Sequence, residues 1–159
     1  MKKVVTHKQS HQLNIYSGYT YIQGLHREIL CMKLLYNTFL THGCTCGRNK
    51  PHFPIMLNNK IGSNSGYITM THQGMDIQKM RKKQQKVIID NESIHNQIDC
   101  IMNILNKAQI VHLDLNDNGK NICINDDGHI SIIDFDIMYL KYFDNMTTLT
   151  PLMLKRINR

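Results

Sequence analysis

The chain has 159 residues, with 19 Lys+Arg against 12 Asp+Glu, which gives a formal charge of +7 at pH 7. This length suits one domain with a real hydrophobic core, and an apolar content of 42% excludes global disorder. No apolar run approaches the ~20 residues of a membrane span, and no apolar segment follows the basic N-terminus as in a signal peptide. We therefore expect an intracellular protein whose five Cys are reduced thiols.

The first third of the chain predicts short strands followed by one long helix. Val4-Val5-Thr6 and Leu13–Tyr16 are typical of strands. A helix is predicted over Leu25–Leu40, with Glu28 beside its apolar stripe. The stripe consists of Leu25, Ile29, Met32, Tyr36 and Phe39.

The middle of the chain begins with an irregular segment, residues 41–66, in which Phe53–Leu57 is a candidate strand. Tyr67–Met70 predicts a further strand, and a short helix is expected from Met75. Asn91 is the expected N-cap of a longer helix that runs to the Ile110 region. The apolar stripe of that helix is predicted to be Ile94, Ile98, Ile101, Leu105 and Ala108.

A hairpin is predicted farther on, because two β-branched segments flank Asp126-Asp127-Gly128. A two-residue turn at Asp127-Gly128 would place Asn121 directly opposite Asp134, on one face. An amide and a carboxylate are hard oxygen ligands of the kind that Mg²⁺ prefers. The pair therefore indicates a magnesium site, although an ordinary surface hairpin with polar ends is the alternative.

The residues around this hairpin carry a family resemblance. His112-Leu113-Asp114 precedes Asn121 and the hairpin, and Asp134-Phe135-Asp136 follows. This order resembles the catalytic loop of the protein kinase-like superfamily, in which His-x-Asp is followed by Asn, a hairpin and Asp-Phe-Gly. The resemblance implies that Asp114 is the catalytic base, that His112 supports the loop, and that Asn121 and Asp134 hold Mg²⁺.

Two departures from the family pattern are visible. Six residues separate Asp114 from Asn121, where four are usual. Asp136 stands where protein kinases have Gly, so a residue that tolerates positive φ is lost. An acidic residue at this position is similar to kinases that phosphorylate small molecules.

The resemblance extends over roughly residues 20–140 and implies an α+β, protein kinase-like fold. Residues 1–73 would form a reduced small lobe with an antiparallel sheet and one helix, and residues 74–159 a truncated helical lobe. Glu28 looks like the glutamate that pairs with a phosphate-binding lysine, which would be Lys8, with Lys3 as its rival. Met70 and His72 would belong to the hinge that binds adenine. No Gly-x-Gly-x-x-Gly loop precedes the first helix.

Three functional hypotheses follow. The first is an ATP- and Mg²⁺-dependent kinase acting on a hydroxyl group of protein Ser/Thr or of a small molecule. The chain resembles small viral kinase-like proteins, and a protein of that kind would be located in the host cytoplasm. The second is a catalytically inactive, kinase-like binding protein, and the third a basic nucleic-acid-binding domain. Basic residues cluster at 79–83 and 155–159. If these clusters do not bind an anionic partner, they are a solvated helix face and a tail.

One further group of residues has metal-binding chemistry. His42, Cys44, Cys46 and His52 give His-x-Cys-x-Cys-x5-His, and thiolate with imidazole suits Zn²⁺. Cys-x-Cys is tighter than the spacing of common structural zinc sites, so we expect a surface loop with reduced thiols. Cys31, Cys100 and Cys123 fall in apolar patterns and are expected in the core.

Overall fold

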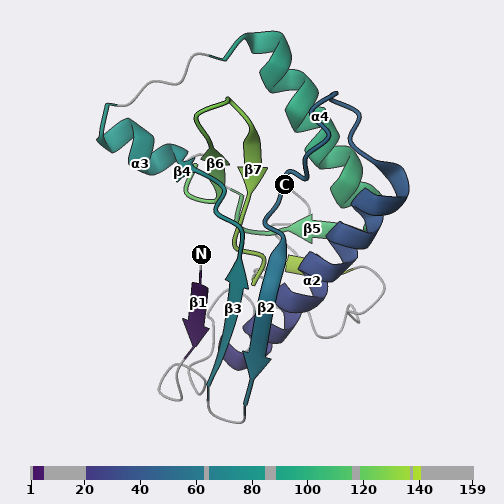
Figure 1. Ribbon diagram of the computed structural model, residues 1–159, viewed down its shortest axis with the longest axis vertical. Helices are drawn as coiled ribbons and strands as arrows, with labels where there is room; N and C mark the ends of the chain where they lie inside the picture. The colour runs from purple at the N-terminus through teal and green to yellow at the C-terminus, as the bar shows by residue number, and fades with distance from the viewer. Residues whose placement is uncertain are drawn as a thin grey trace.

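The computed structural model describes residues 2–5, 21–62, 65–84, 89–115, 119–136 and 138–140. The helices in these ranges are α2 (Tyr21–His42), α3 (Ile77–Lys82) and α4 (Asn91–Lys107). The strands are β1 (Lys2–Val5), β2 (Met56–Ile61), β3 (Gly66–Met70), β4 (Met75–Asp76), β5 (Ile110–His112), β6 (Ile122–Ile124), β7 (Ile130–Ile132) and β8 (Met138–Leu140). All strand pairs are antiparallel, in the orders β1-β3-β2, β4-β6-β7 and β5-β8 (Figure 1). The expected α+β class is confirmed.

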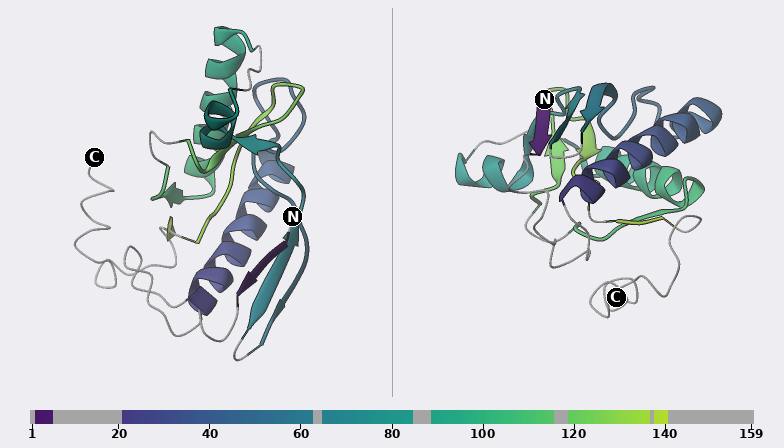
Figure 2. Two further views of the ribbon diagram at one scale, coloured as in Figure 1. Left: turned by 90° about the vertical axis from the view of Figure 1, so that its left-hand side faces the viewer. Right: turned by 90° about the horizontal axis from the view of Figure 1, so that it is seen from below.

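The β1-β3-β2 sheet forms a layer with α2 along one of its faces (Figure 2). Along β3, residues 66, 68 and 70 are buried, whereas Tyr67 and Thr69 are partly exposed. This alternation is the period of a strand with one face on the core. The predicted strand Tyr67–Met70 is confirmed, while β2 begins only at Met56, so the candidate strand at Phe53 was placed too early. Leu13–Tyr16 lies outside the described residues.

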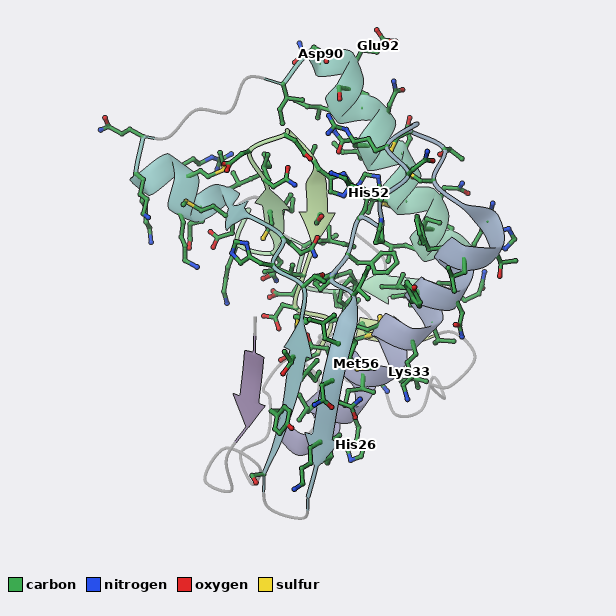
Figure 3. All side chains as sticks on the ribbon, viewed as in Figure 1. His26, Lys33, His52, Met56, Asp90 and Glu92 are labelled. Carbon is green, nitrogen blue, oxygen red and sulfur yellow. The ribbon has the colours of Figure 1, made fainter. Side chains whose placement is uncertain are left out.

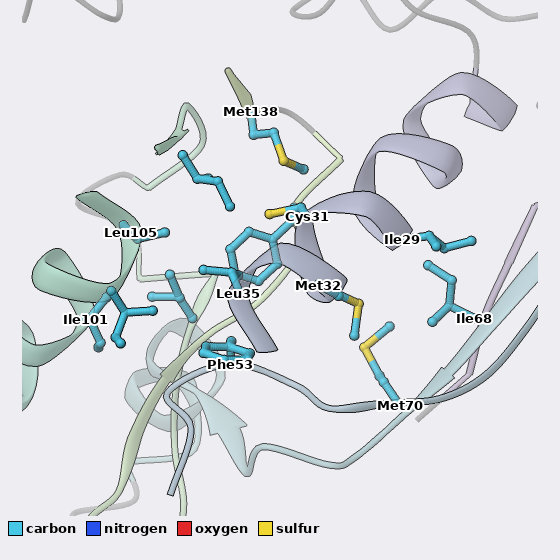
Figure 4. Packing of buried hydrophobic residues seen from close by; sticks show 14 of the residues in the cluster. Ile29, Cys31, Met32, Leu35, Phe53, Ile68, Met70, Ile101, Leu105 and Met138 are labelled. Carbon is cyan, nitrogen blue, oxygen red and sulfur yellow. The ribbon is translucent and has the colours of Figure 1, made fainter. Parts of the chain in front are cut away.

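Helix α2 is buried on two sides, which explains why its single predicted stripe is partly wrong. Tyr36 is 38% exposed, whereas Leu35 is completely buried. Ile29 and Met32 face Ile68 and Met70 of the sheet, and Cys31 and Leu35 face Leu105 and Met138 (Figure 4). A helix wedged between a sheet and a second helix needs two apolar faces rather than one.

Helix α4 differs from its prediction at two positions. Its N-cap is Asp90, whose carboxylate accepts from Ser93 N–H at 2.7 Å, and not Asn91. Ile98 is 44% exposed, whereas Gln97 is 1% exposed. Gln97 Nε2 donates to Gly128 O at 3.1 Å, and Gln97 Oε1 accepts from Ile130 N–H at 2.8 Å. Gln97 is buried where the pattern predicted Ile98, because its side-chain amide bonds to backbone groups of the hairpin.

The β6–β7 hairpin exists as predicted, but its register differs by one residue. The pairs are Ile122↔Ile132, Cys123↔Ser131 and Ile124↔Ile130. The loop contains three residues, 126–128, and ends in a Gly128 with φ +73°. A type I turn followed by a left-handed glycine is the common three-residue hairpin loop. The two-residue turn was therefore wrong, and Asn121 lies opposite Ile133 rather than Asp134, with Ile133 N–H donating to Asn121 O at 3.0 Å.

The segment after the hairpin forms a further strand. Met138–Leu140 forms β8 and pairs with β5, with His112 opposite Met138. Met138 is completely buried, so this pairing attaches the chain beyond Asp136 to the core. None of the helices in the described ranges is both long and apolar enough to cross a bilayer.

Candidate functional site

Asn121 joins the two halves of the candidate site. Its Nδ2 group donates to the Asp114 carbonyl oxygen at 3.0 Å and to Asp114 Oδ2 at 2.9 Å. Its backbone carbonyl accepts from Ile133, the residue before Asp134. Asn121 is only 3% exposed, so this amide is a buried bridge between the 112–114 segment and the second hairpin strand. The longer loop after Asp114 does not prevent the two side chains from meeting.

Asp134 has a left-handed backbone conformation, with φ +67°. Such a conformation costs a non-glycine residue about 1–3 kcal/mol and persists where the surroundings impose it. Here Ile133 is held by Asn121, and the next residue, Phe135, is completely buried. The left-handed turn stands at Asp134 and not at Asp136, so the acidic residue in place of glycine carries no positive-φ strain.

His112 is a buried connector between the loop and the hairpin. Its Nε2–H donates to Ile133 O at 3.0 Å, and its Nδ1 accepts from Asp114 N–H at 3.2 Å. These partners assign the proton to Nε2. The centroid of the His112 ring lies 5.1 Å from the centroid of the Phe135 ring. Burial lowers the pKa of His112, against the opposing charges of Asp134, Asp114 and Asp136.

The carboxylates of Asp134, Asp114 and Asp136 all act electrostatically on His112, the last residue of β5. The predicted base, the predicted support residue and both predicted metal ligands, namely Asp114, His112, Asn121 and Asp134, are brought together there by the contacts above.

Glu28 lies on α2, with 1% of its surface exposed. Gly24, one helical turn earlier on the same face, lies against Asp136: a Cβ built on Gly24 would be 3.5 Å from Asp136 Cβ. Arg27, the neighbour of Glu28, donates to Met138 O at 2.9 Å. This part of α2 therefore packs against the segment that follows Asp134. The expected partner Lys8 lies outside the described residues.

A cavity of about 460 Å³ opens beside the 72–76 segment. Its walls come from the predicted hinge, from β4 and α3, from β6 and from the end of the hairpin, and include His72, Gly74, Lys79, Ile124 and Ile133. Gly74 has φ +93°, and a Cβ there would overlap the Ile124 carbonyl. Only glycine permits this close approach of the hinge to β6. The predicted hinge residue His72 lines the cavity, whereas Met70 is buried in the core beside Met32 (Figure 4).

Two polar residues of the cavity were not singled out as site residues by sequence reasoning. Asp76 caps α3 by accepting from Lys79 N–H at 2.8 Å, and its other oxygen lies 2.9 Å from Lys79 Nζ. Lys79 belongs to the basic cluster that was interpreted as a solvated helix face. An Asp directly before a helical segment is the N-cap signal that locates the pair. The cavity therefore has one cation on its wall.

Comparisons with known proteins give a structural likeness only. No family model matches the chain, and no curated protein matches it. The fold is similar to solved structures of WbdD, described as a bifunctional kinase-methyltransferase, with a TM-score of 0.56 at 20% identity over 88% of this chain. The structure of monomeric WbdD gives a TM-score of 0.58 at 21% identity, also over 88%. The matched region spans 28% and 30% of those chains.

The lowered pKa of His112 predicts a pH-dependent stability. The unfolded imidazole takes up a proton near pH ~6.5, whereas the folded one resists protonation to lower pH. Its contribution to stability is therefore complete above that pH and is lost as the pH falls. The free energy of unfolding should drop between about pH 7 and pH 5, and drop less in His112→Gln, which cannot titrate.

Denaturant unfolding at the two pH values measures this difference. Asn96→Ala, an exposed change on α4, serves as the control and should keep the wild-type pH dependence. An equal drop in His112→Gln and wild type would show that His112 does not bind its proton as described.

Proposed function

We propose that the protein is a phosphotransferase with a kinase-like fold, which uses ATP and Mg²⁺ and acts on a hydroxyl group. The observation that carries the proposal is the Asn121 bridge, which joins the candidate base to the strand leading into the candidate metal ligand. The similarity to WbdD, described as a kinase-methyltransferase, supports the same class of reaction. Phosphoryl transfer needs positioning and charge stabilisation more than covalent chemistry from the protein.

Asn121 and Asp134 are the residues proposed to hold Mg²⁺. Asn121 Nδ2 is used in donating to Asp114, so its Oδ1 is the atom left to serve as a ligand. Asp134 supplies a charged oxygen, and its left-handed backbone is the strain expected of a positioned functional group. The donor set is hard oxygen, as Mg²⁺ prefers, and the ion would neutralise charge on the phosphates.

The cavity beside 72–76 is the proposed nucleotide site. Its volume of about 460 Å³ falls within the range of small-molecule pockets. Backbone groups of residues 72–74 are suited to hydrogen bonds with adenine, and Ile124 and Ile133 supply apolar surface for its faces. Ile133 lines the cavity and adjoins Asp134, so the nucleotide and the metal ligands share one backbone segment.

Asp114 is proposed to orient the acceptor hydroxyl and to take its proton. It lies on the loop after β5 rather than on the hairpin, and the Asn121 amide fixes one oxygen of its carboxylate. A hydrogen-bonded carboxylate beside the transferred group is a suitable general base. The acceptor is a protein Ser/Thr or a small molecule.

Lys8 lies outside the described residues, so the structure bears only on its rival Lys3 as the proposed partner of Glu28. In the β1–β3 pair, Lys3 stands opposite Ile68 and Lys2 opposite Thr69. Directly opposed residues share a face, and Ile68 is buried on the face that α2 covers. Position 3 is therefore on the side of the sheet where Glu28 lies. A carboxylate as buried as Glu28 is costly unless a cation or donors compensate it.

A second candidate function is a kinase-like protein that binds nucleotide without transferring phosphate. The hydrogen bond from Asn121 to Asp114 also favours this second function, because it already occupies Asp114 Oδ2. The loop between the two residues is also long. The two functions differ in whether Asp114 acts as a base, which the variants below decide.

Asp134→Asn should weaken nucleotide binding in Mg²⁺ about tenfold or more, because it removes a charged metal ligand. Asn tolerates the left-handed backbone, so the change tests charge rather than strain. Asn121→Ala should show a smaller loss, because a neutral amide contributes less. Calorimetry with and without Mg²⁺ is the measurement, and Asp99→Asn, exposed on α4, is the control. Unchanged affinity in Asp134→Asn would remove it from the metal site.

Asp114→Asn should leave nucleotide affinity nearly unchanged and lower phosphate transfer about 100-fold or more, because its role belongs to the transition state. Affinity and ATP turnover are measured on one preparation, with protein, amino-alcohol and sugar acceptors. An active wild type with an equally active Asp114→Asn would exclude Asp114 as the base. A wild type that binds Mg-ATP but transfers to none of these acceptors would favour the second function.

Lys3→Met should weaken Mg-ATP binding about tenfold or more, because a charged partner of Glu28 and of the phosphates is lost. Lys2→Met, the neighbouring position on the other face, is the matched control and should bind as wild type does. Lys8→Met is measured beside them. A loss confined to Lys8→Met would restore Lys8 as the partner of Glu28.

A further inference from the structure

Four metal-ligating side chains converge away from the candidate site. Cys44 and Cys46 come from the loop after α2, His52 from the segment before β2, and Cys100 from α4. Their ligand atoms all lie within 4.8 Å of one another. Cys100 and His52 are buried, whereas the two loop thiols are partly exposed. In Figure 3, His52 lies beside α4, the helix that carries Cys100.

The four ligand atoms are close enough together to share one central ion. Cys44 Sγ lies 2.9 Å from both Cys46 Sγ and Cys100 Sγ, and His52 Nε2 lies 3.1 Å from Cys46 Sγ and 3.4 Å from Cys44 Sγ. Tetrahedral Zn²⁺ with thiolates at ~2.3 Å separates its sulfurs by about 3.8 Å. A small outward shift of the sulfurs would therefore complete a Cys₃His site.

His52 is oriented as a metal-binding histidine. Its Nδ1–H donates to Ile130 O at 2.6 Å, which directs Nε2 at the sulfurs. Metal-bound histidines commonly donate their second ring N–H to a carbonyl or carboxylate in this way. The His52 ring also stacks on His129, with centroids 4.5 Å apart, and its backbone carbonyl accepts from Ile132 N–H at 2.9 Å. Three separate contacts thus fix this ligand.

The cysteine side of the cluster joins the loop to α4. Cys100 Sγ on α4 lies 2.9 Å from Cys44 Sγ on the loop. Gly47, with φ +77°, turns the chain directly after Cys46. Each of these thiols would lose its proton on binding a metal ion.

We propose that Cys44, Cys46, His52 and Cys100 form a structural zinc site. The site has four protein ligands and no open position, which is typical of structural rather than catalytic zinc. It uses soft sulfur ligands and is separate in chemistry from the oxygen ligands proposed for Mg²⁺. Binding releases the thiol protons to the solvent and changes no oxidation state.

The local sequence pattern did not reveal this cluster, because the fourth side chain is remote in sequence. Cys100 lies 56 residues after Cys44, on a helix face that was predicted to be core. His42, the ligand that the local pattern suggested, is exposed and does not belong to the cluster. The short Cys-x-Cys spacing is suited to a site that takes its remaining ligands from a histidine loop and a helix.

A zinc ion at this site would fix the position of the β6–β7 hairpin. His52 bonds β7 on both sides of its backbone, through Ile130 O and Ile132 N, while Cys100 sits on the helix whose Gln97 bonds the same strand. Zinc would therefore join the loop, α4 and β7, and β7 leads directly to Asp134.

The test begins with untagged, full-length protein purified without chelator. Elemental analysis should find about one zinc per chain, and chelation should lower the melting temperature. Zn²⁺ should restore that temperature and Mg²⁺ should not. Co²⁺ added to the chelated protein should give the intense visible bands of tetrahedral thiolate coordination.

Cys100→Ser and Cys44→Ser should lose the bound metal and the cobalt bands. Cys31→Ala, which removes a buried thiol outside the cluster, and His42→Ala, which removes the exposed local alternative, should keep both. If a ligand variant does not fold, the metal content and Co²⁺ spectrum of wild type still decide the matter.

Zinc far below one per chain together with no cobalt bands would overturn the proposal. So would a Cys44–Cys46 or Cys44–Cys100 disulfide, seen as a loss of two hydrogens in the mass of the unreduced protein. Retention of zinc by Cys100→Ser with loss in His42→Ala would move the site to the local pattern. None of these outcomes depends on phosphotransfer.

Discussion

The backbone of residues 130–133 is the constraint on which the other parts of the structure depend. Five of its backbone polar groups bond to residues of four other segments of the chain. The partners are Gln97 for Ile130 N, His52 for Ile130 O and Ile132 N, Asn121 for Ile133 N, and His112 for Ile133 O. One strand thus sets the positions of α4, of the histidine loop and of the candidate catalytic segment. A shift of one residue would exchange the two faces of this strand and break all of these bonds.

The positions of the cavity and of Asp134 follow from the segment 130–133. Its last residue, Ile133, lines the cavity, and the chain then turns through the left-handed Asp134 into the buried Phe135. Helix α2 contacts the chain that follows Asp134, because Gly24 lies against Asp136 and Arg27 donates to Met138 O. The proposed metal ligands therefore stand between two anchored segments, which is the rigidity that positioning of a metal ion requires.

Local patterns in the sequence predicted several of the elements in their correct order. The helix around Glu28, the strand Tyr67–Met70 and the hairpin before Asp134 carry strong periodic or turn signals, and the structure has all three. His112, Asp114 and Asn121 were identified through a resemblance, and the structure brings them into hydrogen-bonding contact. Whether they act in phosphotransfer stays a prediction.

The features that were missed depend on contacts between distant residues. Asp-Gly permits both a two-residue and a three-residue loop, and only the packing of β7 selects the second. Gln97 is polar and so does not show as a core position, although it is buried against the hairpin. Cys100 joins Cys44 only after α4 packs beside the loop. Such pairings leave no periodic trace in the sequence, which is why the register, the α4 stripe and the cysteine cluster were wrong or incomplete.

Asn121 and Asp134 are proposed to hold a divalent ion against a nucleotide bound beside residues 72–76. A crystal structure with Mn²⁺ and a non-hydrolysable ATP analogue tests this proposal most directly, because the anomalous signal of Mn²⁺ locates the ion independently of the chain. We expect one Mn²⁺ bound by Asn121 Oδ1 and an Asp134 carboxylate oxygen, with the adenine in the cavity. An ion elsewhere, or an analogue bound outside this cavity, would contradict the proposal.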